Sequence, residues 1–130
     1  MRCSEQTENK IFDMINAMAE KKQKKAMELY YDLLALKEPP MRILYLITRQ
    51  FNLLMQVKEL SEEGYSAKTI SERLKMAGFI VRNCLRQAEY FSLKTLKEAL
   101  QDCVRMEEAV KTGRMNDVMS VELLLVKYSS

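Results

Sequence analysis

Four polar side chains in one short segment have the types that read DNA bases. Arg82, Asn83, Arg86 and Gln87 follow one another at the spacing of neighbouring helical turns. Arginine pairs with the edge of guanine in the major groove, and asparagine and glutamine pair with the edge of adenine. If one helix presents all four on an outer face, they could make sequence-specific hydrogen bonds to duplex DNA.

The surrounding segment, 66–92, has the pattern of a helix-turn-helix that would position this face. Ser66 can cap a helix over 67–74, and a turn that holds Gly78 leads into a second helix from about Phe79. The apolar side of that second helix comprises Ile80, Val81, Cys84, Leu85 and Ala88. Two packed helices with a solvated outer face would give the same pattern, because any surface helix carries polar residues there. The local sequence leaves both interpretations open.

The composition of the 130-residue chain favours one all-helical domain. Hydrophobic residues make up 48% and charged residues 30%, which is an ordinary balance for a globular protein. Because only three glycines and two prolines are present, long helices with short connections are expected. A chain of this length supports a single hydrophobic core. The net charge of +3 is too small to indicate a nucleic-acid partner by itself.

Hydrophobic spacing predicts about seven helices in a single compact domain, with no strand. After a polar tail over 1–7, Thr7 could cap a helix over 8–20. A second helix follows the lysine-rich segment 21–25. It must stop before Pro39, because the residue that precedes a proline is pushed out of the helical region.

The third predicted helix, over 41–63 and ending at Gly64, is the longest and most apolar element. Apolar side chains cover more of its circumference than one packed face requires. This width predicts a central position in the core, and a helix that also contacts another protein is the alternative. Ser92 caps the sixth helix, and the last helix begins near Asn116 or Asp117.

The chain lacks the usual residues of catalytic and metal sites. It has no histidine, and its three cysteines are widely separated, whereas most zinc sites need closely paired ligands and most general bases are histidines. Three isolated glycines cannot form a phosphate-binding loop. We therefore expect no metal, no cofactor and no independent enzymatic activity. Unpaired cysteines and the lack of a long apolar run predict a soluble protein of a reducing compartment, without a membrane span.

Several segments occur in an order that is typical of one family. The RQF motif at 49–51 lies within LITRQFNLLMQVK, after a loop that ends in EP. Downstream, LRQA is followed by an aromatic residue and a capping serine, and KTGRMNDVMSVELLLVKY follows an acidic pair at 107–108. Over about residues 8–128 the chain resembles the C-terminal helical domain of the delta subunit of bacterial DNA polymerase III. It departs from the family at 78–80, where members often have a proline after the glycine.

The resemblance implies an oligomerisation domain, or collar, through which clamp-loader subunits assemble into a ring. It implies a non-catalytic part of the DNA polymerase III holoenzyme, which loads the sliding clamp onto DNA during replication in the bacterial cytoplasm. The expected partners are the collar domains of the other clamp-loader subunits. The sliding clamp would be bound only through the family's N-terminal AAA+ type module, which this chain is expected to lack together with the lid domain. DNA would be contacted at most indirectly.

On this interpretation residues 8–130 form the collar domain, and the helix-turn-helix pattern reflects packing within it. The sequence does not identify the partner interface. The alternative is a helix-turn-helix DNA-binding protein whose reading face is Arg82, Asn83, Arg86 and Gln87.

Overall fold

The computed structural model describes residues 2–130, with side chains from Gln6 onward, and this part of the chain forms helices and no strand. The helices are α1 (Arg2–Ala19), α2 (Gln23–Ala35), α3 (Pro40–Glu62), α4 (Ala67–Leu74), α5 (Gly78–Ala88), α6 (Leu93–Lys111) and α7 (Asp117–Tyr128). Among the described residues, no helix is both long and apolar enough to cross a membrane. The prediction of an all-helical domain is confirmed.

Most helix ends lie where the sequence signals place them. The side-chain oxygens of Ser66, Ser92 and Asn116 each accept a hydrogen bond from a backbone N–H in the first turn, which caps α4, α6 and α7. α3 begins at Pro40, where a helix does not need the missing N–H. After α3, Gly64 has a φ of 99°, in the left-handed region that favours glycine.

The start of α1 differs from the prediction. The helix already begins at Arg2, so residues 2–7 are helical where a polar tail was expected. Thr7 therefore does not cap the helix; it is buried, and its hydroxyl donates a hydrogen bond to the carboxylate of Glu38 at 2.6 Å. A contact between segments so far apart in the sequence could not be read from the local pattern.

The turn between α4 and α5 also differs from the prediction. Helix α5 begins at Gly78 rather than at Phe79, and Gly78 has an ordinary negative φ. The left-handed residue of the turn is Lys75, with a φ of 57°. The turn therefore does not depend on glycine flexibility.

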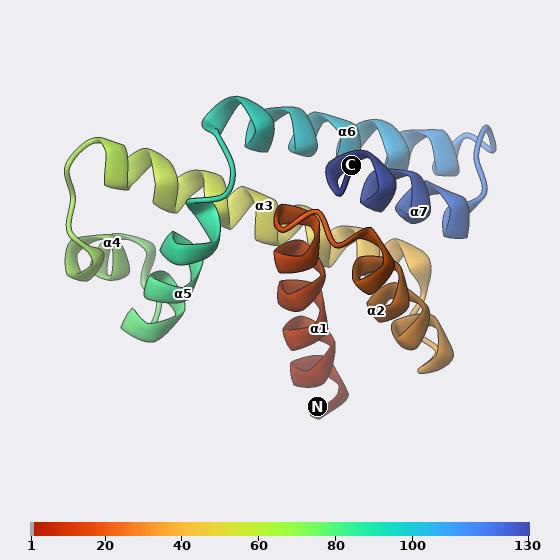
Figure 1. Ribbon diagram of the computed structural model, residues 1–130, viewed down its shortest axis with the longest axis horizontal. Helices are drawn as coiled ribbons and strands as arrows, with labels where there is room; N and C mark the ends of the chain where they lie inside the picture. Colours follow the sequence, from red (N-terminus) through yellow and green to blue (C-terminus); the bar gives the residue numbers. More distant parts are fainter. Residues whose placement is uncertain (1) are drawn as a thin grey trace.

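Helix α3 runs along the long axis of the molecule, and the other helices are arranged around it (Figure 1). It packs against α1, α4, α5, α6 and α7, whereas α2 packs mainly on α1 and α7. Because α3 is covered from several directions, Leu46, Phe51 and Val57 are all buried, and Tyr45 is the one large apolar side chain of α3 that remains exposed. The central position predicted for this helix is confirmed, and its wide apolar surface is used within the domain.

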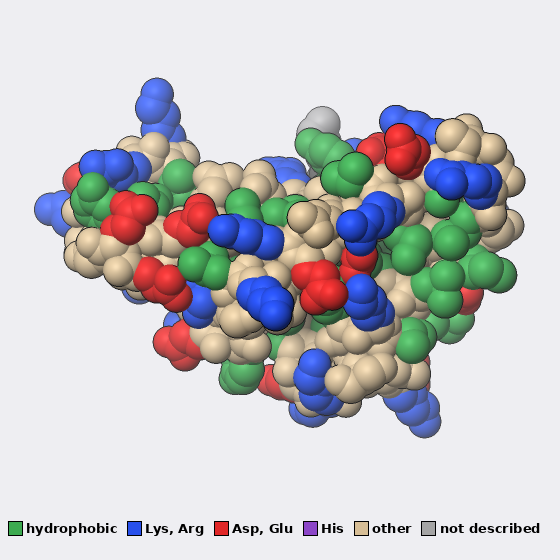
Figure 2. Space-filling view, turned by 90° about the horizontal axis from the view of Figure 1, so that it is seen from above, with side chains coloured by type: hydrophobic (Ala, Val, Ile, Leu, Met, Phe, Trp, Pro, Cys, Tyr) green, Lys and Arg blue, Asp and Glu red, His purple; other side chains and the backbone are tan. Residues whose placement is uncertain are grey.

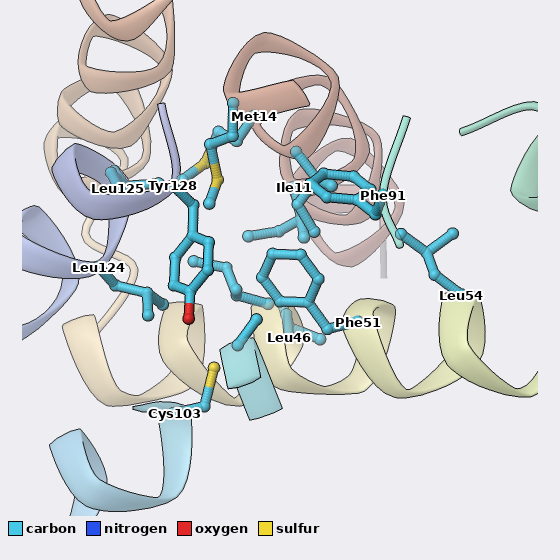
Figure 3. Packing of buried hydrophobic residues seen from close by; sticks show 14 of the residues in the cluster. Ile11, Met14, Leu46, Phe51, Leu54, Phe91, Cys103, Leu124, Leu125 and Tyr128 are labelled. Carbon is cyan, nitrogen blue, oxygen red and sulfur yellow. The ribbon is translucent and has the colours of Figure 1, made fainter. Parts of the chain in front are cut away.

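Phe51 lies at the centre of the core (Figure 3). Its fully buried ring meets the ring of Phe91 edge-on, with 5.8 Å between centroids, and the ring of Tyr128 at 6.2 Å. Phe91 lies in the connection between α5 and α6, and Tyr128 is the last residue of α7. One aromatic side chain of α3 thus joins distant parts of the chain through apolar burial and ring contacts.

The side chain of Gln87 links α5 to α1 and α3 from within the core. It is only 2% exposed. Its amide nitrogen donates to the side-chain oxygen of Asn16 at 2.8 Å and to the backbone carbonyl of Phe12 at 3.0 Å. Its oxygen accepts a hydrogen bond from the side-chain nitrogen of Gln50 at 3.0 Å. Because donors and acceptor are all paired, the buried amide is compatible with a stable core.

Two buried tyrosine hydroxyls tie α7 to the rest of the domain. The hydroxyl of Tyr30, on α2, donates to the backbone carbonyl of Val118 at 2.9 Å. The hydroxyl of Tyr128 donates to the carboxylate of Asp102, on α6, at 2.5 Å. Burial, and then the charge of nearby carboxylates, raises the pKa of Tyr30; burial, and then the hydrogen bond to Asp102, raises the pKa of Tyr128.

We predict that Gln87→Leu lowers the free energy of unfolding by about 2 to 3 kcal/mol, because the buried groups that bond to Gln87 lose their partner. Urea denaturation followed by circular dichroism measures the change. Arg82→Ala, an exposed position on the same helix, is the control and should change stability by less than about 0.5 kcal/mol. Equal unfolding midpoints for the Gln87 variant and the parent would contradict the role of the network.

We also predict that Tyr30→Phe lowers stability at neutral pH by about 1 kcal/mol and that this difference shrinks above about pH 10. A raised pKa in the folded state means that the tyrosine stabilises the fold below its unfolded-state pKa and loses this contribution as the pH rises towards the folded-state value. Urea denaturation at several pH values between 7 and 11 tests this, and a difference that stays constant would count against it.

Candidate functional site

The four polar residues proposed to read DNA do not form one outer face. Arg82 and Arg86 are exposed, and Asn83 is partly buried and accepts a hydrogen bond from Arg86 at 3.2 Å. Gln87 points inward, where its amide takes part in the network with α1 and α3. The expectation that all four residues face outward therefore does not hold for Gln87.

Helical geometry explains the position of Gln87. It follows Ile80 by nearly two full turns, so both side chains lie on the same side of α5. This signal was present in the sequence, but the polar side chain indicated a solvated position. The partners that make its burial favourable, Asn16 and Phe12, belong to α1 and cannot be identified from the sequence of α5.

The residues of the RQF motif support the fold. Phe51 is in the core, and Gln50 donates to Gln87. Arg49 is exposed, and its guanidinium lies 3.5 Å from the carboxylate of Glu8 on α1. An exposed pair of this kind contributes little to stability. The motif therefore mainly joins α3 to α5, to the α5–α6 connection and to the end of α7.

The described residues offer no obvious place for metal or nucleophilic chemistry. They contain no group of three or more His, Cys, Asp or Glu side chains that could hold a metal ion. Cys84 and Cys103 are buried free thiols. Burial raises the pKa of Cys84, and raises that of Cys103 to about 11, so both thiols stay protonated at neutral pH. Their positions are those of small apolar residues in a core.

Helix α7 is apolar on two opposite faces. Its inward face is buried in the core and consists of Val121, Leu124, Leu125 and Tyr128. On the opposite face Met119, Leu123 and Val126 are 50%, 43% and 37% exposed. A helix that is apolar all round is normally covered all round. α7 contacts α1, α2, α3 and α6 on its inner side, and the domain leaves its outer side uncovered.

The outward apolar residues of α7 form one continuous ridge. Met119, Leu123 and Val126 are four and three residues apart, so they lie in line along the helix. Tyr31 of α2, which is also exposed, lies beside this line because its hydroxyl donates to the carboxylate of Glu122 at 2.6 Å. We call these residues, Tyr31, Met119, Leu123 and Val126, the α7 face. Figure 2 shows hydrophobic side chains gathered at the end of the molecule where α6 leads into α7.

The α7 face is the best candidate for a functional site in the described part of the chain. Exposed apolar side chains that line up on one helix are typical of surfaces that bind another protein. The sequence does not identify the interface, and it offers contact with another protein only as the alternative to a core position for the third helix. The signal for α7 was the nearly unbroken apolar run over 121–126, which is more than one buried face requires.

Comparisons of the sequence and of the structure with known proteins point to the same family. The family described as DNA polymerase III delta subunit, C-terminal domain, matches residues 8–128. DNA polymerase III subunit delta of Bacillus subtilis (strain 168) is 34% identical over 120 residues, which are 92% of this chain and 35% of that protein.

A solved structure, the Bacillus subtilis DNA clamp loader delta protein, matches with a TM-score of 0.90 and 33% identity, over 95% of this chain and 36% of that one. The chain thus spans about a third of the length of these relatives. Because the family match extends over nearly all of its residues, the chain belongs to the DNA polymerase III delta subunit family, as a C-terminal domain of that family.

Proposed function

We propose that this chain is the oligomerisation (collar) domain of a delta subunit of the DNA polymerase III clamp loader. It holds the subunit in the complex through contacts with other clamp-loader subunits and performs no chemistry. The complex would load the sliding clamp onto DNA during replication, in the bacterial cytoplasm. The observation that carries the proposal is the α7 face, an apolar ridge that the domain's own helices leave uncovered.

The partner of the α7 face is an apolar helix surface in the collar domain of a neighbouring subunit. Met119, Leu123 and Val126 form a ridge about 10 Å long, given the helical rise of 1.5 Å per residue, and such a ridge fits the groove between side chains of a second helix. Burying each of these partly exposed side chains contributes on the order of 1 kcal/mol. The ridge would therefore be the apolar centre of a larger contact with a polar rim.

The remaining partners follow from the family. The sliding clamp would be contacted by the N-terminal domains of the family and not by this domain, and DNA at most indirectly. A helix-turn-helix DNA-binding protein has less support, because Gln87 is buried in the core and the net charge is only +3. Of the four residues in the proposed reading face, Arg82 and Arg86 are exposed, and Asn83 is partly buried.

We predict that Leu123→Lys weakens association with the other collar domains at least about tenfold, because it places a charge in the apolar centre of the contact. Size exclusion with light scattering, using this chain and the collar domains of the other subunits from the same source, measures the association. Phe79→Lys is a matched control, since Phe79 is 60% exposed and lies at the start of α5, away from α7.

A chain that stays monomeric with every partner would refute the collar function. Complexes that form equally well with both lysine variants would show that the α7 face is not the contact. In either case a titration with duplex DNA at low salt tests the helix-turn-helix alternative. If that alternative holds, the chain binds DNA, and Arg82→Ala and Arg86→Ala each weaken the binding.

A further inference from the structure

A buried carboxylate on α6 holds the last turn of α7. Asp102 is only 7% exposed. Its Oδ2 accepts hydrogen bonds from the Tyr128 hydroxyl at 2.5 Å and from the Lys127 ammonium at 2.7 Å, and its Oδ1 accepts one from Arg105 at 3.2 Å. Burial acts to raise the pKa of Asp102, but the hydrogen bonds from Lys127 and Tyr128 and the positive charges nearby outweigh it, so the net shift is downward. The carboxylate is therefore charged at neutral pH.

The two contacts from α7 restrict its rotation about the helix axis. Lys127 and Tyr128 are consecutive residues, whose side chains leave a helix about 100° apart. Lys127 reaches the carboxylate from the exposed side of α7, and Tyr128 reaches the same oxygen from the core side. A helix turned by a large angle from this orientation could not make both contacts.

Apolar burial alone selects the orientation of α7 only weakly. The buried residues Val121, Leu124 and Leu125 and the exposed residues of the ridge have similar chemistry, and the hydrophobic effect has no direction. Buried polar contacts can supply the missing specificity, as polar residues do when they fix the register of packed helices. Asp102 can make such a contact, because its side chain is only 10% exposed and its carboxylate bonds from α6 to α7.

We propose that Asp102 is a positioning residue that determines which of the two apolar faces of α7 points outward. With Asp102 in place, the ridge of Met119, Leu123 and Val126 faces outward. The apolar residues of the opposite face, Val121, Leu124 and Leu125, face the core. The importance of this choice for assembly rests on the proposed function, whereas the orientation of α7 can be measured on the chain alone.

Cysteine labelling tests the orientation directly. Leu123→Cys and Leu124→Cys are made separately, and the rate at which each introduced thiol reacts with a maleimide is followed by mass spectrometry of its peptide, which separates it from Cys84 and Cys103. In the parent chain position 123 should react at least about tenfold faster than position 124, because one is exposed and the other buried. Adding Asp102→Asn should lower this ratio at least about threefold.

A matched control separates positioning from general loss of stability. Ile70→Ala removes a buried side chain of α4, which contacts α3 and α5 and lies at the opposite end of the molecule from α7 (Figure 1). The variants are compared at equal distance from their unfolding midpoints. The control should leave the labelling ratio unchanged. If Asp102→Asn does not fold, Lys127→Gln removes the ammonium that contacts Asp102, together with its exposed pair to Glu98, and keeps the contact of Tyr128. It should shift the ratio in the same direction by a smaller factor.

An unchanged labelling ratio in the Asp102 variant, or in Lys127→Gln if that variant has to be used, would overturn the proposal. So would an equal change in Ile70→Ala. These outcomes are independent of the collar function, which fails instead if the chain stays monomeric with every partner collar domain. If both hold, Asp102→Asn should also weaken association with the partner collar domains at least about threefold.

Discussion

Helix α3 carries apolar side chains around most of its circumference, so the chain must cover it from several directions. Helices α1, α5, α6 and α7 each supply part of that cover, and α4 closes the end near Gly64. The ring of Phe51 on α3 is an example of this cover. It contacts the aromatic rings of Phe91, in the α5–α6 connection, and of Tyr128, the last residue of α7. The positions of the outer helices depend on this one requirement.

Covering an apolar helix does not by itself set the rotation of the helices that cover it. Contacts between apolar side chains are not directional, and a few buried polar groups supply the direction. Gln87 fixes α5 against α1 and α3, and Tyr30 fixes α2 against α7. Asp102 does the same between α6 and α7. Each of these groups has its hydrogen-bonding atoms paired, so burial carries no large penalty.

The predictions from sequence succeeded where the signal is local. The caps at Ser66, Ser92 and Asn116, the proline start of α3 and the central position of that helix all follow from residue type and spacing. They failed where the deciding partner is distant in the sequence. Thr7 lies within α1 and its hydroxyl bonds to Glu38, and Gln87 is buried because α1 and α3 satisfy its amide. The α7 face was missed because an apolar run does not show how many of its sides the fold will cover.

On the proposed function, folding and binding use separate sets of apolar residues in this domain. The apolar surface of α3 is buried in the core, so substitutions there act on stability. The outer side of α7 contributes little to the core and is exposed, so it is free to contact a partner. This separation depends on α7 keeping one orientation, because its two faces are chemically alike. On the proposed role of Asp102, a buried carboxylate that bonds to both the exposed and the core side of the last turn distinguishes them. The contact that holds α7 on α6 would then also determine which apolar face is left for the proposed partner.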